Sequence, residues 1–137
     1  MKKFLICAAT LNLLLFIGHL LCLGCLDKAF AVYGIQDKMN DLSGGNDAIL
    51  YGVTILIAIC FGLCGLWGYS KAGIIRQLPL LNLGIFAVAA VFLLRGVYGL
   101  YKLWLSFSWI ELPSTVVALF VGIAYLLSLR QSGIIME

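Results

Sequence analysis

Four long runs of apolar residues constrain this chain more than any other feature. A helix needs about 20 predominantly apolar residues to cross the hydrocarbon core of a bilayer. Runs of that kind cover residues 4–26, 48–69, 78–103 and 113–129. With 64% hydrophobic residues, 11% charged residues and a mean hydropathy of +1.11, the chain carries more apolar surface than a soluble domain can bury. We therefore predict an all-α fold, a four-transmembrane-helix bundle.

The four runs leave no room for a water-soluble domain. The longest connection, residues 27–47, carries glycine and asparagine residues rather than a hydrophobic pattern. We predict a single integral membrane domain over residues 1–137, in contact with the lipid bilayer, with residues 27–47 as a loop. The sequence has no basic patch on a soluble surface, so it gives no indication of a nucleic-acid partner. The sequence has no P-loop, Rossmann glycine pattern or metal-protease motif.

Lysine and arginine residues are distributed unequally between the two ends of the runs. Cytoplasmic segments beside membrane helices carry an excess of these residues. One side has Lys2, Lys3, Lys71, Arg76 and Arg130, and the other has Lys28, Lys38 and Lys102. We therefore predict a protein of the bacterial inner membrane with both termini cytoplasmic (N-in/C-in) and residues 27–47 periplasmic.

The first run begins like a secretory signal, with MKKFLICAATLNLLLF. The apolar core of a signal peptide is about 7–15 residues long. This run is longer and contains Asn12 and His19. We expect it to be retained as the first membrane helix.

Cys22 and Cys25 form a C-x-x-C pair near the predicted periplasmic end of the first helix. Disulfides persist in that compartment, and such a pair is typical of thiol oxidoreductases, in which one thiolate attacks and the other resolves. A quinone-linked membrane enzyme would also need a second relay, and no further cysteine lies on that side. Packing is the alternative for both residues. We predict no metal site, because two thiols and one histidine are too few ligands.

Arg95 and His19 are polar residues inside predicted spans, at comparable depths on the third and first helices. A charged side chain there is costly and needs a partner, for which Glu111 and Asp47 are the candidates. We predict a periplasm-facing pocket lined by His19, Arg95, Tyr98, Tyr51 and Glu111. Alternatively, Arg95 extends to the outer headgroups and His19 hydrogen-bonds to a neighbouring helix.

Small residues recur at helical spacing on two runs. They are Ser114, Ala118 and Gly122 on the fourth run and Ala58 and Gly62 on the second. Such stripes let another backbone approach closely. They predict close packing either within the bundle or between copies, which leaves open a homo-oligomer or another membrane-protein partner.

The stretch GYSKAGIIRQLPLLNLG, with LLRG in the third run, provides a further pattern. It resembles a family of small bacterial inner-membrane proteins of unknown function over about residues 50–130. The matching positions are Ser70, Ala72, Gly73, Ile75, Arg76, Leu78, Pro79, Leu80, Leu81, Leu93, Leu94, Arg95 and Gly96. A histidine at the His19 position is also similar, whereas the Cys22 and Cys25 pair is not part of the pattern. The resemblance implies four membrane helices and no particular activity.

Three functions remain open at this point. The sequence favours a non-enzymatic membrane protein that binds or conducts a small ligand, a proton or a lipid group through the polar pocket, without a cofactor. The first alternative is a quinone-linked thiol oxidoreductase using Cys22 and Cys25. The second is an accessory or immunity-type protein that binds another membrane protein.

Overall fold

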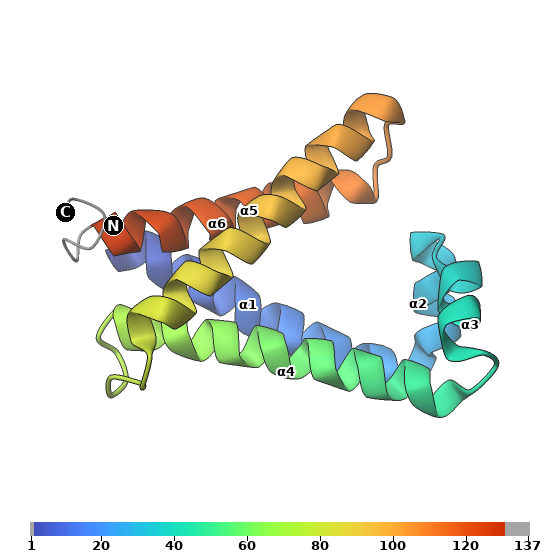
Figure 1. Ribbon diagram of the computed structural model, residues 1–137, viewed down its shortest axis with the longest axis horizontal. Coiled ribbons are helices and arrows are strands. Elements are labelled where there is room, and N and C mark those ends of the chain that lie inside the picture. The colour runs from blue at the N-terminus through green and yellow to red at the C-terminus, as the bar shows by residue number, and fades with distance from the viewer. Residues whose placement is uncertain (1, 131–137) are drawn as a thin grey trace. The chain divides into compact units, whose positions relative to one another are not determined.

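The computed structural model describes residues 2–130, and Met1 and residues 131–137 lie outside the described part. The elements are α1 (Lys2–Cys22), a 3-10 turn η1 (Leu23–Cys25), α2 (Leu26–Tyr33), α3 (Gln36–Ser43), α4 (Asp47–Lys71), α5 (Leu81–Leu105) and α6 (Glu111–Arg130) (Figure 1). Residues 2–130 contain no strand. Four helical segments, Lys2–Tyr33, α4, α5 and α6, are long and apolar enough to cross a membrane. The prediction of an all-α chain with four membrane helices is confirmed, and the chain is built as a multi-pass membrane protein.

The ends of the helices differ from the predicted ends of the spans. The second and fourth helices are longer by up to two residues at each end, and the third runs from Leu81 to Leu105 instead of from residue 78 to 103. Residues 27–47 were predicted as a loop, yet most of them form α2 and α3. Leu26, Phe30 and Tyr33 recur at helical spacing, which gives α2 an apolar face. The polar residues around it make so short a pattern a weak signal in the sequence.

Local signals explain where several helices begin and end. Asn46 precedes α4, and its Oδ1 accepts a hydrogen bond of 3.0 Å from the Ala48 N–H, as an N-cap residue does. Pro113 lies in the first turn of α6, where its missing N–H removes no helical hydrogen bond. α2 and α3 end at Gly34 and Gly44, which adopt φ angles of 63° and 57°. A residue without a Cβ adopts this left-handed conformation at little cost.

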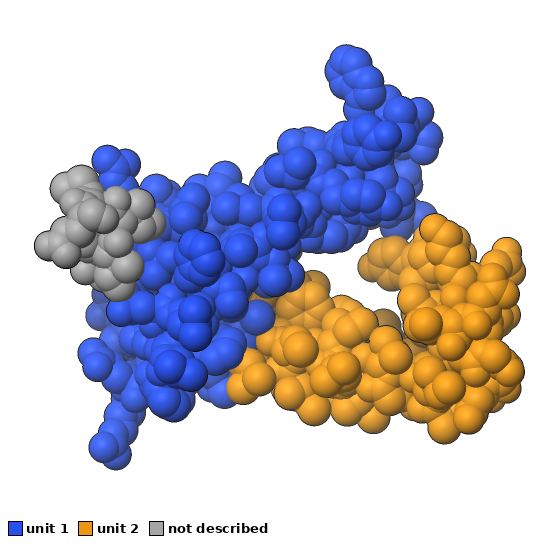
Figure 2. Space-filling view, viewed as in Figure 1, with its two compact units in different colours: residues 1–11, 64–137 blue, residues 12–63 orange. Residues whose placement is uncertain are grey.

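The structure falls into two compact units (Figure 2). Unit 1 comprises residues 1–11 and 64–137, and unit 2 comprises residues 12–63. The division falls within α1 and α4, so each unit holds part of both helices. The single domain expected over residues 1–137 stays a prediction.

In unit 1, α5 and α6 pack side by side (Figure 1). The buried residues of these two helices include Ile85, Val88, Ala89 and Phe92 in α5 and Ala118, Val121 and Tyr125 in α6. The Tyr125 hydroxyl donates a hydrogen bond of 2.6 Å to the Cys64 carbonyl oxygen in the last part of α4. This bond gives the buried hydroxyl a partner and ties α6 to α4 within the unit.

Small residues make the approach of α5 and α6 close. A Cβ atom added at Gly122 would lie 2.8 Å from Cγ of Leu93 and 3.0 Å from its backbone nitrogen. Ala118 is buried on the same stripe, and Ser114 contacts Arg95. The stripe of Ser114, Ala118 and Gly122 therefore faces α5 of the same chain. Packing of this stripe between copies stays a prediction.

The second stripe lies in unit 2. Ala58 is buried, and a Cβ atom at Gly62 would lie 3.4 Å from the Phe16 ring of α1. That is an ordinary contact distance, so the α1–α4 contact at Gly62 is looser than the contact between α5 and α6 at Gly122.

Candidate functional site

Four polar side chains of unit 1 meet between α5 and α6, and we call them the charged cluster: Arg95, Lys102, Glu111 and Ser114. Nη2 of Arg95 donates hydrogen bonds of 3.0 Å to Oε2 of Glu111 and 3.1 Å to Oγ of Ser114. Nζ of Lys102 lies 2.8 Å from the other carboxylate oxygen, Oε1. One carboxylate is thus shared by two cations. Glu111, not Asp47, is the counter-charge of Arg95.

Helical spacing places the two cations together. Arg95 and Lys102 are seven residues apart, which puts both on the face of α5 that meets α6. Glu111 is the first residue of α6, where a carboxylate interacts favourably with the helix dipole. Its backbone oxygen accepts hydrogen bonds from the hydroxyls of Ser114 at 2.9 Å and Thr115 at 2.8 Å. These hydrogen bonds stabilise the first turn of α6, the turn that carries the carboxylate.

Gly99 leaves the space in which the Arg95 side chain lies. A Cβ atom there would lie 3.0 Å from Nη1 of Arg95 and would collide with the Thr115 side chain. Nη1 is buried and has no hydrogen-bond partner among residues 2–130. The guanidinium group is therefore held by packing and by Nη2, while its second amino group makes no hydrogen bond within the described part of the chain.

The charges of the cluster do not cancel. Arg95 and Lys102 contribute two positive charges and Glu111 contributes one negative charge, which leaves a net charge of +1. The side chains of Arg95 and Lys102 are 41% and 43% exposed, whereas that of Glu111 is 25% exposed. The two cations are thus more accessible than the carboxylate that they share.

Several aromatic residues lie in or directly after the end of α5 that carries Lys102. Trp104 and Trp109 are 89% and 77% exposed, and the ring of Trp109 packs edge-on against Phe107 at 5.0 Å. Exposed tryptophans are typical of the membrane–water interface. Lys102 is two residues from Trp104, whereas Arg95 lies about 10 Å deeper along the helix axis. The backbones of the two cations therefore differ in depth along α5, while both side chains reach the same carboxylate of Glu111.

The other predicted pocket residues fall in different places. Tyr98 is next to the cluster, with Nζ of Lys102 5.9 Å from its ring centroid. His19 and Tyr51 belong to unit 2. Nδ1 of His19 donates a hydrogen bond of 2.8 Å to the Leu15 carbonyl oxygen of its own helix, and its ring lies 5.0 Å from that of Phe61. A common pocket of His19 and Tyr51 with Arg95, Tyr98 and Glu111 stays a prediction.

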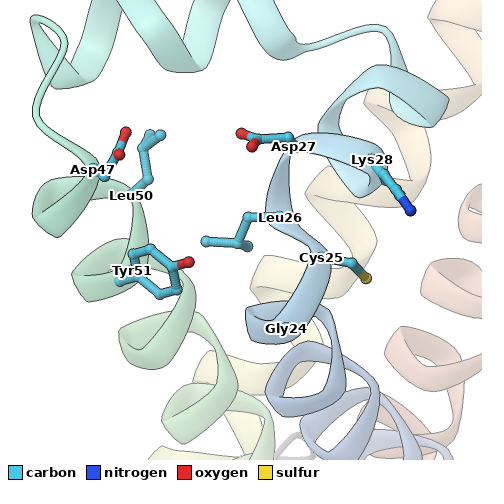
Figure 3. Close-up of a pocket in the computed structure, with 8 residues that line it drawn as sticks. All are labelled: Gly24, Cys25, Leu26, Asp27, Lys28, Asp47, Leu50 and Tyr51. Carbon is cyan, nitrogen blue, oxygen red and sulfur yellow. The ribbon is translucent and has the colours of Figure 1, made fainter.

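A separate pocket of about 280 Å³ lies in unit 2, where η1 and the start of α2 face the start of α4 (Figure 3). The carboxylates of Asp27 and Asp47 face each other across it, with Tyr51 and Leu26 beside them. The side chains of Cys25 and Lys28 point to the other side of their segment (Figure 3). The described residues contain no group of three metal-ligating side chains.

Cys22 and Cys25 are both free thiols, at the end of α1 and in the turn η1 that follows it. Cys25 is exposed and Cys22 is half-buried. Of the two, only Cys25 is among the residues that line the unit 2 pocket, and its side chain points away from that pocket (Figure 3). The thiol oxidoreductase alternative stays a prediction.

Sequence reasoning missed two members of the charged cluster. Lys102 was interpreted only as a topological charge, although its spacing of seven residues from Arg95 placed both on one helix face. Ser114 was interpreted only as a small packing residue, although its hydroxyl accepts a hydrogen bond from Arg95.

No protein family, curated protein or solved structure matches the chain.

Proposed function

We propose that this chain is a non-enzymatic protein of the bacterial inner membrane that binds a small ligand at the charged cluster, with both termini in the cytoplasm. The observation that carries the proposal is the shared carboxylate. Two cations on one face of a membrane helix contact a single anion, Glu111. A net positive charge therefore remains in the cluster. Charged groups inside a membrane segment are costly and are typical of ligand or ion sites.

A purely structural role explains this arrangement less well. A single ion pair between Arg95 and Glu111 would already neutralise the deep arginine. Lys102 adds a second cation to the same carboxylate and restores the charge imbalance. Each charge removed from water costs free energy, and only an opposite charge in good geometry offsets that cost. A purely structural ion pair is therefore most stable when its charges are equal in number. The imbalance therefore supports a role in binding.

The distribution of basic residues supports the proposed orientation. Lys71 ends α4 and Arg76 lies in the segment between α4 and α5, on the side expected to be cytoplasmic. Acidic residues concentrate on the opposite side, in α2, α3 and the start of α4. In this orientation the charged cluster opens toward the periplasmic leaflet.

The proposal is tested by measuring what the protein retains from its own membrane. We expect native mass spectrometry of the protein, purified in a mild non-ionic detergent, to show one bound non-peptide mass. Arg95→Leu should lose that mass while remaining folded, because Glu111 and Lys102 still form a balanced pair. Lys38→Met is the matched control, since it removes one positive charge from the exposed surface of α3. Wild type without a bound mass, or the same mass on Arg95→Leu, would contradict the proposal.

A further inference from the structure

We infer that the ligand of the charged cluster is the phosphate of an anionic phospholipid, taken from the leaflet at the Trp104 end of α5. This inference rests on the proposed function and names its ligand class. It depends on the charge balance of the cluster, on its depth and on which of its atoms are accessible.

The charge balance selects an anion. Arg95 and Lys102 both contact the Glu111 carboxylate, so one positive charge is left without a counter-charge in the cluster. A neutral or cationic ligand would leave that charge in place. A monoanion would cancel it, which is most favourable where the surroundings exclude water.

The depth of the cluster selects a lipid headgroup. Lys102 is two residues from Trp104 on α5, and Trp104 and Trp109 are exposed, as is typical of the level where aromatic side chains meet headgroups. The Arg95 backbone lies about 10 Å deeper along α5, but its Nη2 reaches the same Glu111 carboxylate as Nζ of Lys102. The charge left over is therefore shared by two cations that meet at the Lys102 end of α5, the level at which we expect lipid phosphates.

The accessible atoms select a phosphate. Lys102 is 43% exposed, and of its three ammonium hydrogens one is directed at Oε1 of Glu111. An ammonium group binds phosphate oxygens as a point charge. Glu111 is less exposed than either cation, so the cations offer an approaching anion the more accessible side chains of the cluster.

The test is a titration of defined lipids into the purified protein in a non-ionic detergent at constant salt. Phosphatidylglycerol, which is anionic, is compared with phosphatidylcholine, which carries a phosphate but no net charge. Wild type should bind phosphatidylglycerol about fivefold more tightly, since each basic residue near an anionic surface contributes about that factor. The preference should disappear in Arg95→Leu and in Lys102→Met, because both variants leave a neutral pair. Lys38→Met should keep it.

Inorganic phosphate forms the second arm of the experiment and distinguishes a free anion from a headgroup. We expect millimolar inorganic phosphate to leave lipid binding unchanged, because it lacks the acyl chains that keep a headgroup at this depth. Phosphate that competes fully with phosphatidylglycerol would overturn the lipid assignment and leave the proposed function standing. Equal affinity for both lipids in wild type, or a preference unchanged in Arg95→Leu and Lys102→Met, would overturn the inference. Folding of every variant is checked by its helical circular dichroism.

Discussion

Gly122→Val is expected to force α5 and α6 apart and to lower the free energy of unfolding by about 1–3 kcal/mol. The reason is the backbone nitrogen of Leu93, which would lie 3.0 Å from the first added carbon. A flexible side chain could rotate away from the new atoms, but backbone in a packed helix cannot. Reversible unfolding in neutral bicelles, measured by steric trapping, gives the free energy directly.

Gly18→Val is the matched control for this prediction. Gly18 is also helical, in α1, but nothing lies within 4 Å of a Cβ atom added there. The same substitution should therefore change stability by no more than about 0.5 kcal/mol. Equal losses at both positions would show that valine disturbs these helices for a reason other than the contact of α5 with α6.

Glu111→Gln is expected to lower the free energy of unfolding by about 2 kcal/mol, between the values typical of surface and buried ion pairs. The substitution keeps the size of the side chain and removes its charge. Arg95 and Lys102 then face the same amide without a counter-charge. The same steric-trapping measurement in bicelles of neutral lipid reports the loss without interference from anionic lipid.

A second substitution separates this charge effect from a loss of hydrogen bonding. Adding Arg95→Leu to Glu111→Gln leaves Lys102, near the interface, as the single charge of the cluster. We expect the double variant to recover most of the stability that Glu111→Gln loses. If the double variant is less stable than Glu111→Gln, like-charge repulsion between Arg95 and Lys102 is not the cause of the loss.

The membrane helices could be predicted because their signal is long and physically strict. Backbone N–H and C=O groups inside a bilayer must form their hydrogen bonds within the membrane-spanning segment. A run of about 20 apolar residues therefore predicts one helix. The helix ends depend on short local contacts instead, such as the Asn46 cap and the turn η1. The helices α2 and α3 were not predicted because eight residues each give too short a pattern against a polar background.

The charged cluster was only partly predictable. The cost of Arg95 inside a span predicted a partner, and Glu111 was one of two candidates. The choice between Glu111 and Asp47 depended on which helix lies beside α5, and hydropathy does not contain that information. The pairing of α5 with α6 follows from Gly96, Gly99 and Gly122, which admit Leu119, Thr115 and Leu93.

His19 illustrates the opposite case. Its depth in the first run suggested a partner on another helix, but its Nδ1 hydrogen-bonds to the Leu15 carbonyl oxygen four residues earlier. A polar side chain that bonds to its own helix satisfies one ring nitrogen without a second element. Depth in a span alone therefore predicts that a group needs a partner, but not where that partner lies.

The ratio of affinities for phosphatidylglycerol and phosphatidylcholine in Glu111→Gln tests the account most directly. Removing the carboxylate raises the net charge of the cluster from +1 to +2. Both affinities come from one sample, so any unfolded fraction affects them equally and cancels in the ratio. We predict that the ratio rises about fivefold above that of wild type. A ratio that stays the same or falls would contradict the claim that the charged cluster binds an anionic lipid.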